Sequence, residues 1–432
     1  MRFTSAAVPC LLLMSSILPH WHGQCFAREQ PGKQSQLGQF EVTTDFEGGS
    51  ARILEIDHKK ASIHFMPGGD ADRGWVCWWA MKVSNLDPGQ RLVLLLSPSD
   101  QLTRNNGRVS SKPLDASWSM PLHASLSADG EVWRHSPAGK RDGNQMRYEL
   151  IADSSTLWIA WGPPFTPRHA EEMLELAVDS IPGASRFELA RTRQGRGVNG
   201  LRIQPTEAPA RRPGVWIQAR QHAWETGSSW VARGLVEWLA EQGEEARWLT
   251  RNTELVVVPI MDVDNVTTGN GGKEANPRDH NRDWDEAPVY PEIAAAQRHL
   301  LSWAEEQRLD LFVDLHNPAP KDARPFFFCG PPELLSDVGR DNRALFLGIA
   351  QRHISGPLPV EPSPRVTGAS YHPLWRQISG QWVNEHGNPH THAICLETAW
   401  NTPHSDTEGY RIVGAQLGET IAEFLRRRTR SD

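Results

Sequence analysis

The chain has 432 residues, which is long enough for two domains with separate hydrophobic cores. Hydrophobic residues make up 39% of the chain and charged residues 22%, and these fractions exclude a disordered or fibrous protein. The formal net charge of −7 leaves no basic footprint, so we expect no nucleic acid among its partners.

The N-terminus has the pattern of an export signal. A positively charged start precedes an apolar run at 5–18, and residues 25–27 offer small residues for cleavage. We predict that 1–27 is a signal peptide and that the protein is exported, to the periplasm or the extracellular space; an irregular N-terminus is the alternative. No apolar run reaches the length of about 20 residues that a membrane span needs. The remaining cysteines are too few for a disulfide framework: Cys77, Cys329 and Cys395.

Residues 28–175 are predicted to form an N-terminal β-sandwich domain and a connector. After a polar lead-in to residue 45, short β-rich runs alternate with turns that contain Gly and Pro. Short strands at this spacing favour a β-sandwich. The β-rich runs are 53–56, 75–83, 91–97 and 156–161, and a helix at 167–176 would begin the connector.

Residues 176–432 are predicted to form an α/β domain. Apolar runs with few charges, which are typical of buried strands, alternate with longer helical stretches. This alternation predicts a sheet that is covered by helices on both faces. The predicted strands are 214–219, 255–261, 309–315 and 392–396, and the predicted helices are 228–242, 291–308 and 408–427.

A candidate metal site begins with His222 and Glu225, which follow the strand 214–219 and precede the next helix. Ligands of open α/β sheets lie beyond the carboxyl ends of the strands. A catalytic zinc takes three protein ligands, and two His with one Glu are such a set. The spacing alone is weak, because His169 and Glu172 share it inside the connector helix. A surface turn without a metal is the alternative for His222 and Glu225.

His316 is the candidate third ligand, because it directly follows the buried strand 309–315. A capped histidine at a strand terminus is the alternative, but two candidates at strand ends of one domain favour the metal. His390 and His392 are a competing pair. They would share a strand face that points away from Glu397, so we interpret them as wall or surface histidines.

Glu397 ends the strand 392–396, and a carboxylate at such a position needs either a cationic partner or a catalytic role. Beside a metal that activates water, it would act as general base and later deliver the proton to the leaving amine. A structural salt bridge is the alternative.

Asn281 and Arg282 follow a Gly-rich loop at 269–272. A guanidinium grips a carboxylate with two donors, so an arginine near zinc would select substrates with a free carboxylate. The alternative for Arg282 is an ion pair with Asp279 or Asp283.

Together these motifs resemble those of the zinc carboxypeptidases, and specifically of their cytosolic-carboxypeptidase branch. The chain looks like an exported, bacterial-type member. The branch signature R-x-H-P-G-E-T-x-x-S-W appears at 220–230, with Ala and Trp where the branch has P-G. Within the predicted catalytic domain, 279–284 resembles the branch motif D-L-N-R-x-W, and 194–198, 312–316 and 396–398 resemble further parts of the branch. In the predicted sandwich, the similar segments are 46–50, 79–85 and 160–166. The resemblance therefore covers roughly residues 46–425.

The resemblance implies an α/β, mixed-sheet catalytic domain at 176–432, a preceding β-sandwich domain and one Zn²⁺ per chain. It also implies roles for single residues. His222, Glu225 and His316 would bind zinc, Glu397 would be the general base, and Asn281 and Arg282 would hold the terminal carboxylate of the substrate.

The chain also departs from the branch in two further loops. It reads D-V-D-N at 262–265 where the branch has N-P-D-G, and no Arg stands at 271–273 to polarise the scissile carbonyl. Lys273 is the expected substitute, with Arg278 behind it, and Tyr371 is the residue expected to close over the substrate. The branch removes glutamates from polyglutamylated tails inside cells, which an exported protein would not meet.

The sequence therefore predicts a zinc metallocarboxypeptidase. It would hydrolyse a C-terminal peptide or isopeptide bond through a zinc-bound water, with Glu397 as general base. A zinc amidohydrolase or deacylase that acts on N-acyl amino acids or cell-wall peptides is one alternative. A non-catalytic peptide-binding module is another. The expected partner is a peptide or acyl-amino-acid substrate with a free carboxylate.

Overall fold

The structure of the chain, a computed structural model, describes residues 39–207 and 212–429, and these residues belong to one structural unit. The signal peptide predicted at 1–27 lies outside them. Within the described ranges, no helix combines the length and the apolar character needed to cross a membrane.

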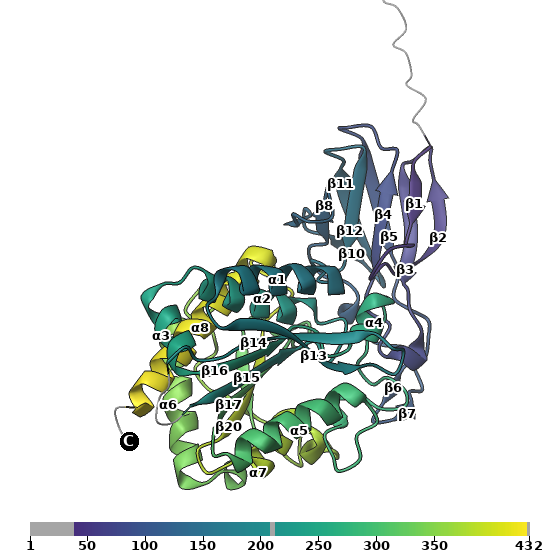
Figure 1. The fold of residues 1–432 in the computed structure, drawn as a ribbon. Coiled ribbons are helices and arrows are strands. Elements are labelled where there is room, and N and C mark those ends of the chain that lie inside the picture. The colour runs from purple at the N-terminus through teal and green to yellow at the C-terminus, as the bar shows by residue number, and fades with distance from the viewer. Residues whose placement is uncertain (1–38, 208–211, 430–432) are drawn as a thin grey trace, which may run out of the picture. The chain divides into compact units, whose positions relative to one another are not determined.

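The N-terminal part is a β-sandwich, as predicted (Figure 1). Its two five-stranded sheets have the orders β1-β4-β12-β8-β9 and β10-β11-β5-β3-β2. Alternate side chains point into the shared core; in β11, Met146, Tyr148 and Leu150 are buried and their neighbours are exposed. The strands are β1 Glu41–Thr43, β2 Ala51–Asp57, β3 Ser62–Pro67, β4 Ala80–Ser84, β5 Arg91–Leu96, β8 Ser125–Ser127, β9 Arg134–His135, β10 Lys140–Asp142, β11 Gln145–Ile151 and β12 Thr156–Ala160, with a hairpin of β6 Arg104–Asn105 and β7 Arg108–Val109.

The strand predicted at 75–83 is shorter than expected. Only Ala80–Ser84 pairs as β4, and residues 75–79 form turns and irregular backbone. The Trp75 N–H donates instead to the carbonyl oxygen of Lys273, in the second half of the chain (2.9 Å). This apolar run is therefore explained by burial between two segments and not by strand pairing alone.

The second half of the chain is built on one mixed sheet of eight strands in the order β13-β14-β16-β15-β17-β20-β18-β19. Its centre, β16-β15-β17-β20, is parallel. Every residue of β15, β16 and β17 is buried, which explains their nearly continuous apolar sequences. The strands are β13 Ala184–Arg191, β14 Gly197–Ile203, β15 Gly214–Ala219, β16 Glu254–Val258, β17 Leu309–His316, β18 Phe326–Cys329, β19 Arg365–Val366 and β20 His392–Glu397.

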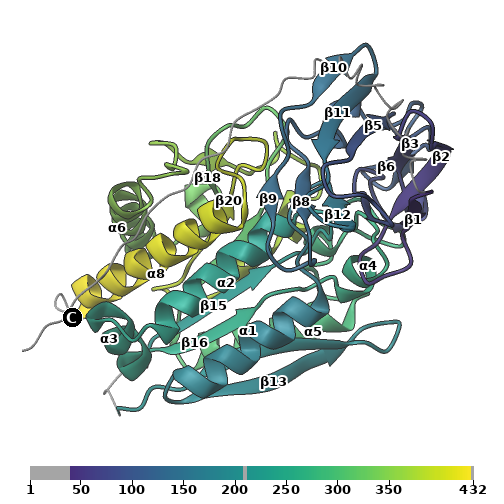
Figure 2. The ribbon, with the colours of Figure 1, turned by 90° about the horizontal axis from the view of Figure 1, so that it is seen from above.

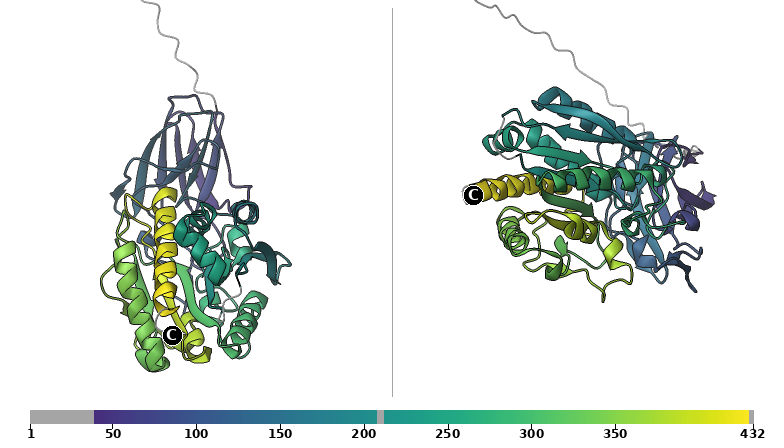
Figure 3. Two further views of the ribbon diagram at one scale, coloured as in Figure 1. Left: turned by 60° about the vertical axis from the view of Figure 1, so that its left-hand side comes forward. Right: turned by 60° about the horizontal axis from the view of Figure 1, so that its bottom comes forward.

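Helices cover both faces of this sheet. Figure 1 shows α1, α2 and α8 on one face and α5 and α7 on the other. Seen from above, α8, α2 and α1 lie side by side (Figure 2), and α6 lies next to α8 (Figure 3). The helices are α1 Pro167–Ser180, α2 Thr226–Ala240, α3 Glu244–Asn252, α4 Val263–Thr267, α5 Pro291–Glu305, α6 Asp337–His353, α7 Ser379–His386 and α8 Thr407–Thr429, with short 3-10 turns at Ala71–Arg73, Ala116–Trp118, His280–Arg282, Pro332–Leu334 and Trp375–Gln377.

Several elements at the margins of this sheet carry no clear signal in the sequence. Strands β13 and β14 form an antiparallel pair at its edge, and β13 contains polar residues that break the apolar pattern. Helices α3 and α6 are rich in charged residues, and α7 is short. Helix α1, expected to begin a connector, packs Met173 and Leu174 into the core of the α/β sheet.

Candidate metal centre

Two neighbouring parallel strands bring the three candidate ligands to one edge of the sheet. Strand β15 ends at Ala219, which pairs with Leu315 in β17, so the loop after β15 lies beside the end of β17. His222 and Glu225 lie in that loop, and His316 is the last residue of β17. Each of the three residues is only 2% exposed. The candidates are therefore side by side in a place where polar groups need partners.

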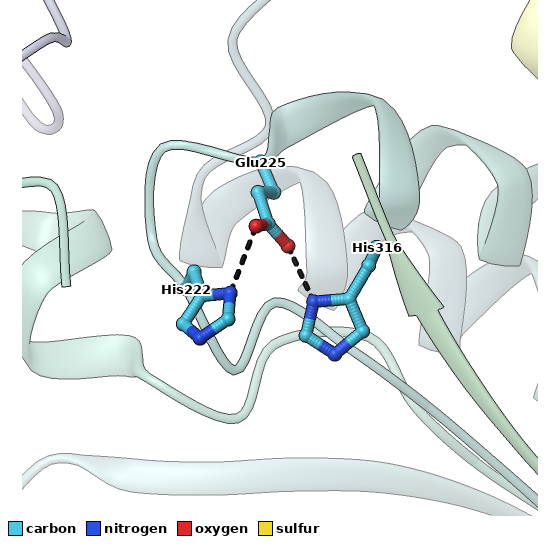
Figure 4. Close-up of side chains that lie close together, drawn as sticks. All are labelled: His222, Glu225 and His316. Carbon is cyan, nitrogen blue, oxygen red and sulfur yellow. Dashed lines mark hydrogen bonds and ion pairs between the residues drawn. The ribbon is translucent and has the colours of Figure 1, made fainter. Parts of the chain in front are cut away.

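The three side chains face one another (Figure 4). His222 Nδ1 lies 2.8 Å from Glu225 Oε1, and His316 Nδ1 lies 2.6 Å from Oε2 of the same carboxylate. The candidate ligand atoms all lie within 4.8 Å of one another. Two imidazole nitrogens and a carboxylate directed at one point are a donor set that suits a catalytic Zn²⁺ with one position left open.

A buried carboxylate lies next to the Nε2 atom of each imidazole ring, on the side away from Glu225. His222 Nε2 lies 3.0 Å from Asp279 Oδ1, and His316 Nε2 lies 3.0 Å from Asp314 Oδ2. His316 Nε2 also lies 3.2 Å from the Asn281 amide nitrogen Nδ2. When His222 donates its Nε2–H to Asp279, its neutral ring directs the lone pair of Nδ1 at Glu225. Lone pairs would then face lone pairs unless a cation lies among them. The donor set therefore fits a metal ion.

The electrostatics of the cluster also favour a positive charge among these side chains. Burial would lower the pKa of His316, but the carboxylates of Asp314 and Glu225 raise it well above its usual range. Burial would raise the pKa of Glu225, but the imidazoles of His222 and His316 lower it below its usual range. Both shifts have one cause, which is the attraction between the rings and the carboxylates.

Sequence reasoning considers Asp279 only as a partner for Arg282 and misses Asp314. A signal for Asp314 does exist, because it stands two residues before His316 in one strand, and such residues share a strand face. No comparable local signal connects Asp279 with His222, since the two are 57 residues apart.

The loop that carries the first two candidate ligands is fixed from both sides. Arg220 is buried and has a φ of 62°, which is uncommon for a residue with a side chain. Its Nε–H donates to the Ala223 carbonyl oxygen (3.0 Å). Trp224 packs edge-on to Trp118 and Trp161 of the β-sandwich, with ring centres 5.7 and 5.4 Å apart. The sandwich thus helps to hold the ligand loop.

Glu397 lies beside the cluster. It is the last residue of β20 and pairs with His316 across the parallel strands β17 and β20. Its Oε2 is buried and has no hydrogen-bond partner among the residues that the structure describes. Burial raises the pKa of Glu397 to about 7, although His316 opposes the shift. A carboxylate with a free oxygen and a pKa near neutrality suits proton transfer.

Asn281 and Arg282 line the same cavity as the candidate ligands. Asn281 Oδ1 accepts a hydrogen bond from the Ser379 N–H (2.9 Å), which fixes the amide. Arg282 donates from Nη1 to the Asn281 carbonyl oxygen (2.7 Å), and its buried Nε has no partner among the described residues. A guanidinium with a free donor at a cavity wall suits a carboxylate that arrives with the substrate.

Lys273 and Tyr371 line this cavity as well. Burial would lower the pKa of Lys273, but the Asp279 carboxylate raises it above its usual range, so the ammonium is charged at neutral pH. Tyr371 is 46% exposed, and the centre of its ring lies 5.2 Å from that of Phe328. Both residues can therefore reach a bound substrate.

Arg278 does not line the cavity, although the sequence analysis expects it behind Lys273. Its guanidinium Nη1 lies 3.0 Å from Asp283 Oδ1 and 2.6 Å from Asp285 Oδ2. Two carboxylates thus hold this side chain within its own loop.

The competing histidines lie away from the cluster. His169 is buried at the start of α1, where its Nδ1 accepts a backbone N–H (3.1 Å). The interpretation of His392 as a wall or surface residue is wrong, because His392 is fully buried and its ring contacts Phe346 and Phe424. The back of the central strand β20 is covered by α6 and α8, which explains this burial. His390 lies in the turn before the strand.

Apart from Arg278, the candidate site residues line one cavity of about 370 Å³. Trp75 and Trp118 of the β-sandwich form part of its wall. A second, more open groove of about 620 Å³ adjoins it, because both are lined by Trp118, Ala319 and Lys321. Together they offer room for a substrate longer than one residue.

We expect Asp279→Asn to weaken zinc binding by about 10- to 100-fold, since the amide keeps the shape of the carboxylate but loses the charge that supports His222. Competition with a zinc-binding dye measures the affinity. Asp264→Asn is the matched control, because the Asp264 carboxylate pairs with Arg196 (2.8 Å) and is not one of the cavity residues. Equal zinc affinities of the two variants would contradict the supporting role of Asp279.

Comparison with known sequences connects the site with one protein family. A model of the family described as zinc carboxypeptidase matches residues 170–318. An uncharacterized protein of Zymomonas mobilis is 24% identical over 310 residues, which cover 71% of this chain and 74% of that protein. Human cytosolic carboxypeptidase 1 is 33% identical over 113 residues, and mouse cytosolic carboxypeptidase 3 is 27% identical over 182. The matched regions are 26% and 40% of this chain but only 9% and 18% of these two relatives.

Solved structures of bacterial proteins share the fold. A metallo-carboxypeptidase of Burkholderia cenocepacia has a TM-score of 0.73 at 21% identity, and the match covers 90% of this chain and 100% of the other. A metallo-carboxypeptidase of Pseudomonas aeruginosa, in complex with (2-guanidinoethylmercapto)succinic acid, has a TM-score of 0.71 at 20% identity, with 89% and 99% covered. The common fold thus includes most of the described chain.

Proposed function

Because this chain carries a zinc carboxypeptidase domain, we propose that it is a zinc metallocarboxypeptidase that hydrolyses a C-terminal peptide or isopeptide bond. One observation carries the proposal: the ligand atoms of His222, Glu225 and His316 converge in the cavity that Glu397 and Arg282 also line. A candidate metal site, a carboxylate with an unpartnered oxygen and a guanidinium with an unpartnered Nε among the described residues are what this reaction needs in one cavity.

Each residue of the site has a separate role in the proposed reaction. When bound, zinc supplies Lewis-acid chemistry that makes water nucleophilic near neutral pH. Glu397 takes a proton from this water and later delivers it to the leaving amine nitrogen. Arg282 and Asn281 hold the terminal carboxylate, which fixes the scissile bond relative to Glu397. Lys273 brings a positive charge to the carbonyl oxygen, where negative charge develops, and Tyr371 closes over the substrate.

The shape of the site favours a peptide over a small N-acyl amino acid. The cavity of about 370 Å³ continues into the groove of about 620 Å³ that shares Trp118 with it. The groove would hold the residues that precede the scissile bond, whereas a small acyl group would not reach it.

We expect a peptide with a free C-terminal carboxylate to be hydrolysed roughly 30- to 4000-fold more efficiently, in kcat/KM, than the same peptide with a C-terminal amide. The reason is that an unpaired buried charge costs about 2–5 kcal/mol. Release of the last amino acid, followed by mass spectrometry, measures both rates. N-acyl amino acids with the same terminal residue are assayed in parallel.

Arg282→Ala should remove most of this preference. Arg278→Ala is the matched control and should keep the preference, because Asp283 and Asp285 hold that guanidinium. Hydrolysis of N-acyl amino acids but not of peptides would favour the amidohydrolase or deacylase. Purified protein without stoichiometric zinc and without turnover would favour the binding module.

We also propose that the protein is exported and acts in the periplasm or outside the cell. The support for this proposal is the sequence of residues 1–27, which lie outside the described ranges. Such a location would bring the site into contact with extracellular or cell-wall peptides and not with cytosolic proteins.

A further inference from the structure

A short segment of the β-sandwich, residues 72–75, runs along the loop 272–276 that carries Lys273. We refer to residues 72–75 as the docking segment. It is held against the loop by three backbone hydrogen bonds. The bonds run from Gly272 N–H to Arg73 O (2.9 Å), from Trp75 N–H to Lys273 O (2.9 Å) and from Asn276 N–H to Asp72 O (2.7 Å).

The side chain of Trp75 continues this contact into the cavity. The Lys273 Nζ lies over the Trp75 ring, 5.4 Å from its centre, and both residues line the cavity. Among the residues that the structure describes, the ammonium makes no hydrogen bond and no ion pair. A lysine stem is flexible, so the cation–π contact helps to orient the charge, in addition to the attraction of the Asp279 carboxylate.

Close packing leaves two positions of the loop without room for a side chain. A Cβ on Gly271 would overlap the Trp75 carbonyl oxygen. A Cβ on Gly272, whose φ is 78°, would lie 2.6 Å from Asp262 Oδ2 and 2.7 Å from the Ala223 nitrogen. Neither position has room for a side chain, and the first residue after them that can reach the cavity is Lys273.

We infer that Trp75 positions the Lys273 ammonium at the site of the developing oxyanion, so that the β-sandwich completes the active centre. Trp75 acts through Lys273 and is therefore a positioning residue. The inference rests on the proposed function, in which Lys273 supports the carbonyl oxygen. Two charged groups also act on the Lys273 ammonium: the Asp279 carboxylate attracts it and the Arg282 guanidinium repels it.

A double-mutant cycle tests the coupling between the two side chains. Trp75→Leu should lower kcat by roughly 2- to 30-fold, with KM and zinc content unchanged, because the cation–π contact is lost. Trp75→Phe keeps an aromatic face and should restore part of the rate. In a Lys273→Met background, Trp75→Leu should have no further effect on kcat, because the charge that Trp75 positions is already gone.

Trp133→Leu is the matched control. Trp133 is buried in the same sandwich core and does not line the cavity, so its loss should lower stability and leave kcat unchanged in both backgrounds. This control separates a local effect of Trp75 from a general weakening of the sandwich.

If the losses of kcat in the two single variants add up in the double variant, the inference is overturned. If Trp75→Leu does not fold, the cycle is run with Trp75→Phe, and additivity there has the same meaning. Full kcat of Lys273→Met would also overturn the inference, while zinc-dependent hydrolysis by that variant would leave the proposed function intact. A zinc-loaded wild-type protein that hydrolyses no peptide would overturn both.

Discussion

Replacing Glu397 with Gln is expected to lower kcat by about 10²- to 10⁴-fold, with the zinc content unchanged. Glutamine has the shape of glutamate but accepts no proton at neutral pH. Glu397 is not one of the three proposed ligands, so their geometry should persist. The rate of amino-acid release from a peptide, measured together with metal analysis of the same sample, checks both parts of the prediction.

Glu254→Gln is the matched control for this change. Glu254 is a buried glutamate on β16 whose carboxylate accepts from Arg202 (2.7 Å) and Arg308 (2.6 Å). Its replacement should cost stability and leave kcat unchanged. A Glu397→Gln variant with normal kcat would exclude proton transfer by Glu397, and a variant without zinc would indicate that Glu397 holds the metal.

Replacing His222 with Ala is expected to abolish zinc binding and turnover together. The change removes one of the three proposed ligands. Loss of a group that only supports a ligand weakens zinc binding by up to about 100-fold, so the loss of a ligand should weaken it further. It also removes the ring partner of Glu225 Oε1 and Asp279 Oδ1, two buried carboxylate oxygens. Metal analysis after dialysis, and activity with and without added zinc, measure the result.

His169→Ala is the matched control, because His169 and Glu172 have the same H-x-x-E spacing as the ligand pair. The Nδ1 of His169 accepts the Thr166 N–H at the start of α1, so the change should cost about 0.5–2 kcal/mol of stability, as the loss of a helix cap does. Zinc content and kcat should stay at the wild-type level. Zinc bound in full by His222→Ala would contradict the ligand set.

Much of the fold follows from local patterns. The mostly apolar sequences of β15, β16 and β17 predict buried parallel strands, since both faces of such strands are covered. Edge elements carry a weaker signal. Strands β13 and β14 are antiparallel and partly exposed, so their sequences are not distinct from those of loops.

The sequence by itself determined which side chains stand at the ends of the central strands. His222, His316 and Glu397 each follow or end an apolar run, and parallel strands carry such residues to a common edge. For this reason the ligand cluster could be predicted before any distance was known.

Only the tertiary structure decided what surrounds these residues. Asp279 supports His222 across 57 residues, Trp75 of the sandwich reaches Lys273, and paired carboxylates hold Arg278 away from the cavity. Such contacts join segments that are distant in the chain, and their geometry depends on how sheets and loops pack against one another. No periodicity or spacing within a single segment encodes them, because each partner's local sequence is compatible with several other arrangements.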